Sequence, residues 1–332
     1  MSGVRLGIGG ICFEIEGDDP ELERRVVELL SDTGFQRLES QCGSPARIEV
    51  EPGASVVSSE GALEVARHHQ VRVLRTATNG LVIHDERSRV DIDPGQQSIR
   101  MQLAEELRTT PVRGRGFLLV LYSVLTYLRF RGLYPLHGAG VARNGEPACL
   151  LVGASQTGKT TMTMDLVRHG WRWLSDDSLA LHREGDRIEA IAMRSDAFSR
   201  ESDSPFRQRE GWLEGKDGEH SGKYRVPLRR TYESQWLPSA PVGVIVMPAL
   251  TKAETSSWAR CSREEALFLL LEHSSIADLE PSSTPAHVEL LRDLVLQSPS
   301  YRLEAGTDLR NNGTELDRLL SHVMADAEQY WR

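Results

Sequence analysis

A glycine-rich loop beginning at Gly153 has the residue types and spacing of a phosphate-binding site. Its sequence is GASQTGKT over residues 153–160. Glycines let such a loop turn tightly, so that consecutive backbone N–H groups point at one phosphate. Lys159 can reach the β- and γ-phosphates, and the Thr160 hydroxyl is a ligand for Mg²⁺. We therefore predict a Walker A nucleotide site. The predicted nucleotide-binding residues are Gly153, Ala154, Ser155, Gln156, Thr157, Gly158, Lys159, Thr160 and Thr161.

Two adjacent carboxylates, Asp176 and Asp177, follow the loop closely in the sequence. Neighbouring residues of a strand point to opposite sides, which favours a division of labour over a joint grip on one ion. One carboxylate can hold Mg²⁺, and the other can accept the proton of an attacking hydroxyl, as phosphoryl transfer to an alcohol requires. The alternative is a solvated turn in which one aspartate caps the next segment.

The elements around these residues have the setting that a phosphate-binding loop needs. A strand at 148–152 enters the loop, a helix at 159–169 leaves it and ends at Gly170, and a strand at 171–177 carries the two aspartates. In open α/β sheets, ligands bind at the carboxyl ends of strands. An Asn144-Gly145 turn joins the entering strand to the one before it.

The rest of the chain predicts two domains. Residues 1–112 form a strand-rich α+β module, with a hairpin at 4–17 and a helix that begins after Asp19 with Pro20 in its first turn. Residues 113–332 form the α/β nucleotide-binding domain. Its apolar run at 116–130 is shorter than the roughly 20 residues that span a bilayer, so it predicts a buried helix. Residues 196–225, rich in charge, Gly and Ser, predict a mobile loop.

Composition narrows the class of partner. The net charge of −9 argues against nucleic acid and anionic membranes as partners, because both attract basic surfaces. The four cysteines form no CxxC pair, which predicts reduced thiols rather than a zinc site or a disulfide framework. The first residues have no basic segment followed by an apolar one, so no signal peptide is expected, and we predict a cytoplasmic protein.

Residues 136–177, LHGAGVARNGEPACLLVGASQTGKTTMTMDLVRHGWRWLSDD, resemble the catalytic core of the HPr kinase/phosphorylase family and its relatives. Some of those relatives phosphorylate lasso-peptide precursors. The resemblance implies a nucleotide-binding domain like that of phosphoenolpyruvate carboxykinase. It also implies that Asp176 is the base toward the acceptor hydroxyl, that Asp177 helps Thr160 to hold Mg²⁺, and that His137 lies beside the transferred phosphate.

We therefore expect a kinase that uses ATP and Mg²⁺ to phosphorylate a hydroxyl, most simply a Ser or Thr of a peptide or small protein. The glycine-rich signature that HPr kinases use downstream for the reverse reaction is absent from the sequence. Lys223 and Arg225 are candidates for contacting the phosphates or the substrate, and a homo-oligomer fits the family. The alternatives are a kinase of a small-molecule alcohol, a nucleotide-gated regulatory protein with little turnover, and a carboxykinase-like enzyme.

Overall fold

The protein divides into two units in a computed structural model, which describes residues 3–39, 43–53, 62–68, 70–112, 115–194, 196–200, 214–216, 223–274, 280–309 and 312–330. Unit 1 comprises Met1–Leu133 and Ile276–Pro285, and unit 2 comprises Tyr134–Ser275 and Ala286–Arg332. The predicted boundary, after residue 112, and this division therefore differ. The apolar helix and a short downstream segment belong to unit 1.

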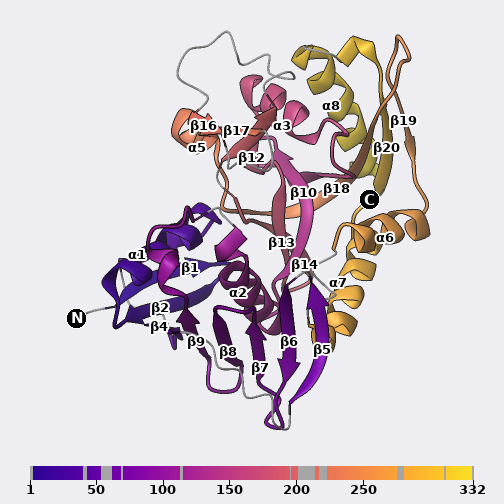
Figure 1. Ribbon diagram of the computed structural model, residues 1–332. Coiled ribbons are helices and arrows are strands. Elements are labelled where there is room, and N and C mark those ends of the chain that lie inside the picture. Colours follow the sequence, from indigo (N-terminus) through magenta and orange to yellow (C-terminus); the bar gives the residue numbers. More distant parts are fainter. Residues whose placement is uncertain are drawn as a thin grey trace. The chain divides into compact units, whose positions relative to one another are not determined.

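Unit 1 is built on a nine-stranded sheet in the order β3-β1-β2-β4-β9-β8-β7-β6-β5 (Figure 1). Its strands are β1 (Val4–Ile8), β2 (Ile11–Gly17), β3 (Gln36–Arg37), β4 (Ala46–Pro52), β5 (Leu63–His68), β6 (Val71–Arg75), β7 (Leu81–His84), β8 (Arg89–Asp93) and β9 (Ser98–Leu103). Its helices are α1 (Pro20–Asp32), η1 (Glu105–Arg108), η2 (Arg115–Phe117), α2 (Leu118–Phe130) and η7 (Pro281–Ser283). The predicted hairpin at the start of the chain is β1–β2.

Local sequence explains where α1 and α2 lie. The Asp19 carboxylate accepts hydrogen bonds from the N–H groups of Glu21 and Leu22 at 3.0 and 3.1 Å, so α1 begins at Pro20 as predicted. The apolar run predicted to be a buried helix is α2, most of whose side chains are buried. No helix in the parts of the chain that the structure describes is long and apolar enough to cross a membrane.

Cysteine pairing differs from the expectation of four reduced thiols. Cys12, in β2, is disulfide-bonded. Cys149 and Cys261 are free, and burial raises the pKa of the Cys149 thiol to about 12. Cys42 lies outside the described residues. Spacing alone gave no sign of the disulfide, because a disulfide depends on which cysteines the fold brings close together.

Unit 2 combines a mixed sheet with helices on two faces, which confirms the predicted α/β class. Its strands are β10 (Tyr134–Ala142), β11 (Ala148–Val152), β12 (Arg172–Ser175), β13 (Ser178–Glu184), β14 (Arg187–Ala192), β18 (Ser239–Leu250), β19 (Ser257–Arg260) and β20 (Ser300–Ala305). Its helices are α3 (Lys159–Arg168), α5 (Leu228–Thr231), η5 (Glu233–Gln235), α6 (Arg263–Glu272), α7 (Thr284–Gln297), η8 (Thr307–Leu309) and α8 (Gly313–Tyr330). The first residues of α7, Thr284 and Pro285, are assigned to unit 1.

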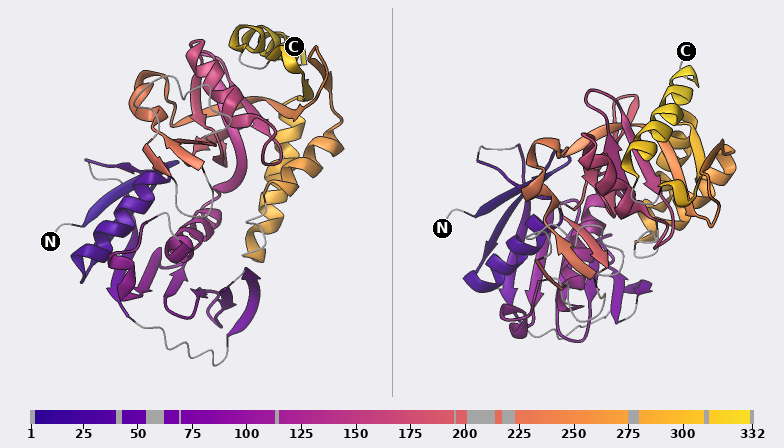
Figure 2. Two further views of the ribbon diagram at one scale, coloured as in Figure 1. Left: turned by 45° about the horizontal axis from the view of Figure 1, so that its top comes forward. Right: turned by 90° about the horizontal axis from the view of Figure 1, so that it is seen from above.

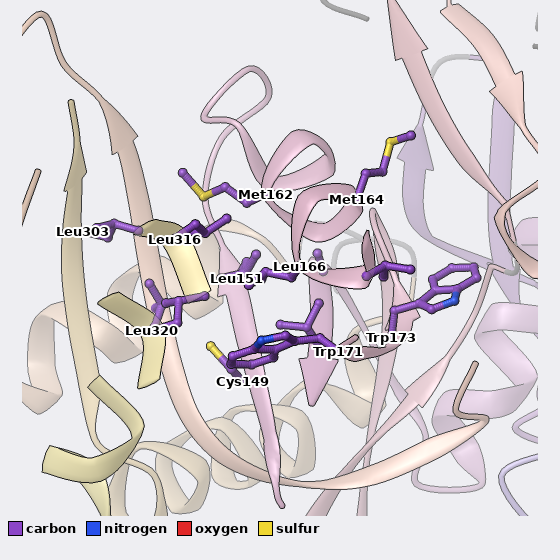
Figure 3. Close-up of a cluster of buried hydrophobic side chains, with 14 of the residues drawn as sticks. Cys149, Leu151, Met162, Met164, Leu166, Trp171, Trp173, Leu303, Leu316 and Leu320 are labelled. Carbon is purple, nitrogen blue, oxygen red and sulfur yellow. The ribbon is translucent and has the colours of Figure 1, made fainter. Parts of the chain in front are cut away.

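Alternation along β11 places the core of unit 2 on both faces of the sheet. Cys149 and Leu151 pack with residues of α3 and α8 in one cluster (Figure 3). Leu150 and Val152 pack with residues of α6 and α7 in another. Figure 2 shows these two helix pairs in two further orientations. Because β11 is buried on both faces, the loop that follows it is anchored in a rigid core.

The predicted mobile loop at 196–225 lies largely outside the described residues. Its described parts form a small sheet in the order β15-β17-β16. These strands are β15 (Ala197–Arg200), β16 (Glu214–Lys216) and β17 (Lys223–Val226).

Candidate active site

Strand direction brings the glycine-rich loop, the two aspartates and His137 to one edge of the sheet. β11 and β12 each pair antiparallel with β10, so their carboxyl ends point the same way. The loop follows the carboxyl end of β11, and Asp176 follows the carboxyl end of β12. β10 runs in the opposite direction, which puts its first residues, including His137, at the same edge. The order of the elements predicted this place for the loop and the aspartates, whereas His137 was expected here from the family resemblance alone.

The backbone of the loop is in the left-handed region at two positions. Gln156 and Gly158 have positive φ values of 72° and 94°. Gly158 is the N-cap of α3, and neither an acidic side chain in the first turn nor a capping side chain occupies the helix N-terminus. The N–H groups and the positive end of the helix dipole are thus suited to a phosphate.

The other predicted loop residues differ in exposure. Ala154, Ser155 and Gln156 are exposed at the top of the loop, and Thr161 is half-buried in the first turn of α3. The Thr157 hydroxyl donates to the Ala154 carbonyl at 3.0 Å. A Cβ at Gly153 would lie 3.3 Å from the Thr157 hydroxyl oxygen, a tight contact that glycine avoids.

Lys159 is buried and points back into the loop. Its Nζ donates to the carbonyl oxygens of Gly153 at 2.6 Å and Ala154 at 2.9 Å. The loop therefore holds a cation beside its own N–H groups, as a site for a phosphate requires.

Asp176 is the buried carboxylate of the pair, only 1% exposed. Its Oδ2 accepts hydrogen bonds from the Thr160 hydroxyl at 3.0 Å and from the Phe198 N–H at 3.4 Å. Its Oδ1 is buried and has no hydrogen-bond partner in the described parts of the chain. Burial, followed by the charge of Asp177, raises the pKa of Asp176 to about 7.

Asp177 is more exposed and contacts two basic side chains. Its Oδ1 lies 3.3 Å from His137 Nδ1, and its Oδ2 lies 3.1 Å from Arg194 Nη1. Its carbonyl oxygen accepts from the Gly138 N–H at 3.1 Å, which ties it to the start of β10. The two carboxylates are therefore in different surroundings, one buried against the loop and the other beside an arginine and a histidine.

Two residues at this site escaped the sequence analysis. Arg194 follows β14, and His273 ends α6, where its carbonyl accepts from the His137 N–H at 2.9 Å. The rings of His273 and His137 are 5.9 Å apart. Burial, followed by the charge of His137, lowers the pKa of His273. The sequence pattern of a strand at 242–250 followed by a helix at 262–274 was the available signal for His273, which lies at the end of that helix. No sequence pattern pointed to Arg194.

The predicted pair Lys223 and Arg225 is not part of this cluster in the contacts the structure describes. Arg225 Nε lies 2.5 Å from Oδ2 of the buried Asp196. Lys223 lies in β17, and its side chain is outside the described residues. Arg194, rather than Arg225, is the arginine that contacts an aspartate of the pair.

The oxygen ligands at this edge fit Mg²⁺. No group of three or more His, Cys, Asp or Glu side chains that could hold a metal occurs in the described ranges. Mg²⁺ does not need such a group, because it keeps several waters and binds one or two carboxylates together with substrate phosphates. The Thr160 hydroxyl and the unpartnered Oδ1 of Asp176 could supply the protein ligands.

Comparisons with known proteins leave the family open. No protein-family model matches the chain, and no curated protein matches it. A solved structure of the HPr(Ser) kinase/phosphatase from Coxiella burnetii is similar over 58% of this chain and 98% of its own, with 10% sequence identity and a TM-score of 0.34. A TM-score this low carries no argument about fold or activity.

Proposed function

We propose that this protein is a phosphotransferase of the HPr-kinase-like type, with a carboxykinase-like nucleotide-binding unit, that transfers the γ-phosphate of ATP to a hydroxyl. A Ser or Thr of a peptide or small protein is the proposed acceptor. The observation that carries the proposal is the gathering at one sheet edge of the loop lysine, the loop threonine and two carboxylates in different surroundings. An ordinary glycine turn would not need that set.

The geometry favours the reverse of the expected roles of the two aspartates. The Thr160 hydroxyl is bonded to Asp176, so Thr160 and Asp176 are the pair best placed to hold Mg²⁺. Asp177, with 28% of its side chain exposed, is the carboxylate that an acceptor hydroxyl can reach. We propose that Asp177 takes the acceptor's proton, with His137 beside it. Mg²⁺, when bound, would neutralise charge on the transferred phosphate.

The test is a screen for Mg²⁺-dependent transfer from labelled ATP to Ser- and Thr-containing peptides, small proteins and small alcohols, run beside nucleotide binding. Asp177→Asn should keep Mg²⁺-nucleotide binding and lose transfer by about 10²–10⁴, the usual cost of a lost general base. Asp176→Asn should weaken Mg²⁺-nucleotide binding itself.

Absence of Mg²⁺-dependent nucleotide binding in the unaltered protein would refute the proposal. If the protein binds nucleotide but transfers phosphate to no acceptor, and if Asp177→Asn leaves its ATP turnover unchanged, the result would instead favour a nucleotide-gated regulatory protein. Transfer to small alcohols alone would move the acceptor class away from peptides.

A further inference from the structure

We propose that Arg194 binds the γ-phosphate, and that it exchanges the Asp177 carboxylate for that phosphate when a nucleotide binds. This inference rests on the proposed function. It assigns to Arg194 the phosphate contact for which Lys223 and Arg225 were the candidates from the sequence. Arg194 contacts the aspartate pair directly, with Nη1 3.1 Å from Asp177 Oδ2.

The position of Arg194 is fixed by neighbours that are themselves part of the site. Its guanidinium carbon lies 4.8 Å from the centre of the Phe198 ring, and the Phe198 N–H donates to Asp176. A guanidinium stacked on an aromatic ring keeps its N–H donors free at its edge. Arg194 is also one-third exposed, so its donors can turn from one oxygen anion to another without leaving the ring.

The negative charge that a γ-phosphate would add to the site favours such an exchange. Two carboxylates stand where a γ-phosphate would add more negative charge, and Lys159 is held inside the loop. Arginine binds phosphate through two parallel hydrogen bonds, which makes it the better partner for the γ-phosphate. The same move would release the Asp177 carboxylate from its arginine partner.

The other arginine proposed for this role lacks the same freedom. Arg225 is paired with Asp196, whose side chain is only 7% exposed. Moving Arg225 to a phosphate would break an ion pair to a buried carboxylate, which is strongly destabilising. Asp177, by contrast, is partly exposed and also lies beside His137, so it keeps a neighbour when Arg194 leaves.

The experiment measures ATP and ADP affinity of the full chain by calorimetry in EDTA, so that no metal contributes. Arg194→Gln should weaken ATP binding by about 10-fold or more, the range of a hydrogen bond to a charged group, and leave ADP within about two-fold. Arg194→Lys should fall between, because it keeps the charge and loses the two-donor geometry. Arg183→Gln is the matched control, since Arg183 forms a surface ion pair with Asp293 at 2.5 Å.

A double-variant cycle separates an exchange from a fixed contact. Asp177→Asn should tighten ATP binding when Arg194 is present, because the arginine is then released without cost, and the gain should shrink in the Arg194→Gln background. Equal losses of ATP and ADP affinity in Arg194→Gln and Arg194→Lys, or an Asp177→Asn gain that persists unchanged without Arg194, would overturn the inference. If the unaltered protein binds nucleotide only with Mg²⁺, the same comparison is made with Mg²⁺ present. Failure to bind either nucleotide even with Mg²⁺ would refute the proposed function instead.

Discussion

At the scale of single residues, burial makes Asp176 a source of instability that the site retains. The folded protein raises its pKa from 3.8 to about 7, so the folded state binds this proton more tightly than the unfolded chain does. The cost is absent below pH 3.8, grows as the pH rises toward 7, and is complete above it. Asp176→Asn should therefore stabilise the metal-free protein at pH 8, by up to about 4 kcal/mol at roughly 1.4 kcal/mol per pKa unit.

Thermal unfolding in EDTA at pH 4 and pH 8 checks this prediction. The gain from Asp176→Asn should be large at pH 8 and nearly vanish at pH 4. Asp177→Asn is the neighbouring control, and its effect should be smaller because Asp177 is partly exposed and paired with Arg194. An Asp176→Asn variant that is less stable than the parent at pH 8 would contradict the account of burial.

Thr160 gives a second prediction at this scale, because its hydroxyl donates to Asp176. Thr160→Ser should keep most Mg²⁺-nucleotide affinity, and Thr160→Ala should lose it, together with about 1 kcal/mol of stability from the missing hydrogen bond. Titration of nucleotide affinity against Mg²⁺ measures the first effect, and thermal unfolding measures the second. Equal losses in both variants would show that the methyl group, not the hydroxyl, matters.

The residues of the site were predictable to different degrees. The loop was readable because its function depends on consecutive backbone groups and fixed spacing. The partner of Thr160 was not readable. The register of β10 with β12 shifts between Gly140 and Val141, and such an irregularity re-aims the side chains that follow. Arg194 follows a different strand, β14, so local spacing carried no signal for it, and His273 had only the strand-helix region at whose end it lies.

At the scale of elements, the two glycines that flank α3 allow the effect of backbone strain on stability to be distinguished from an effect on nucleotide binding. Gly158 and Gly170 both have positive φ, 94° and 89°, which L-residues with side chains disfavour. A Cβ at Gly158 would lie 3.2 Å from Leu250 Cδ2, whereas a Cβ at Gly170 would meet nothing within 4 Å. We expect Gly158→Ala and Gly170→Ala each to cost about 1–2 kcal/mol of stability.

Only Gly158→Ala should also lose nucleotide binding, because it alone lies in the phosphate loop. Chemical unfolding and calorimetric titration with Mg²⁺-ATP measure the two effects separately. Normal nucleotide affinity in Gly158→Ala, or a loss of affinity in Gly170→Ala that matches it, would mean that the loop is not where the phosphate binds.

Elements with strong local signals were predictable, and elements joined by distant segments were not. The Asn144-Gly145 hairpin, α1 and α3 follow from turn and capping residues, and Ser262 caps α6 by accepting the Glu265 N–H at 3.1 Å. The pairing of β11 with β18 joins strands far apart in the chain, and it places Leu250 beside Gly158. Nothing local in either strand specifies that pairing.

At the scale of the whole molecule, the boundary between the two units also could not be predicted from local sequence. The apolar α2 was assigned to the nucleotide-binding domain because it immediately precedes β10 in the chain. In the structure it lies in unit 1, together with a segment that returns after α6. Buried Glu280 of that segment pairs with Arg75 of β6 at 3.2 Å. A contact between residues so distant in sequence leaves no trace in local periodicity.

Tryptophan placement gives a test of where the nucleotide acts on the whole protein. The four tryptophans that the structure describes, at positions 171, 173, 236 and 258, belong to unit 2, and the sequence positions of the other two, 212 and 331, fall within its ranges. Their fluorescence should therefore follow the unfolding of unit 2, while far-ultraviolet circular dichroism follows both units. Mg²⁺-ATP at about 100 times its Kd should stabilise the unit that binds it by about 2.7 kcal/mol. For a unit of this size that corresponds to a rise in Tm of roughly 5–10 °C.

The expected result is a fluorescence transition that moves with Mg²⁺-ATP and a circular dichroism trace in which only part of the signal moves. Lys159→Ala provides the control, because it removes the loop cation that is bonded to the Gly153 and Ala154 carbonyls and should abolish the shift. Nucleotide binding stabilises only the structure whose unfolding destroys the site. A shift of the dichroism signal without any shift of the fluorescence would place the nucleotide in unit 1 and contradict the site at the edge of β11 and β12.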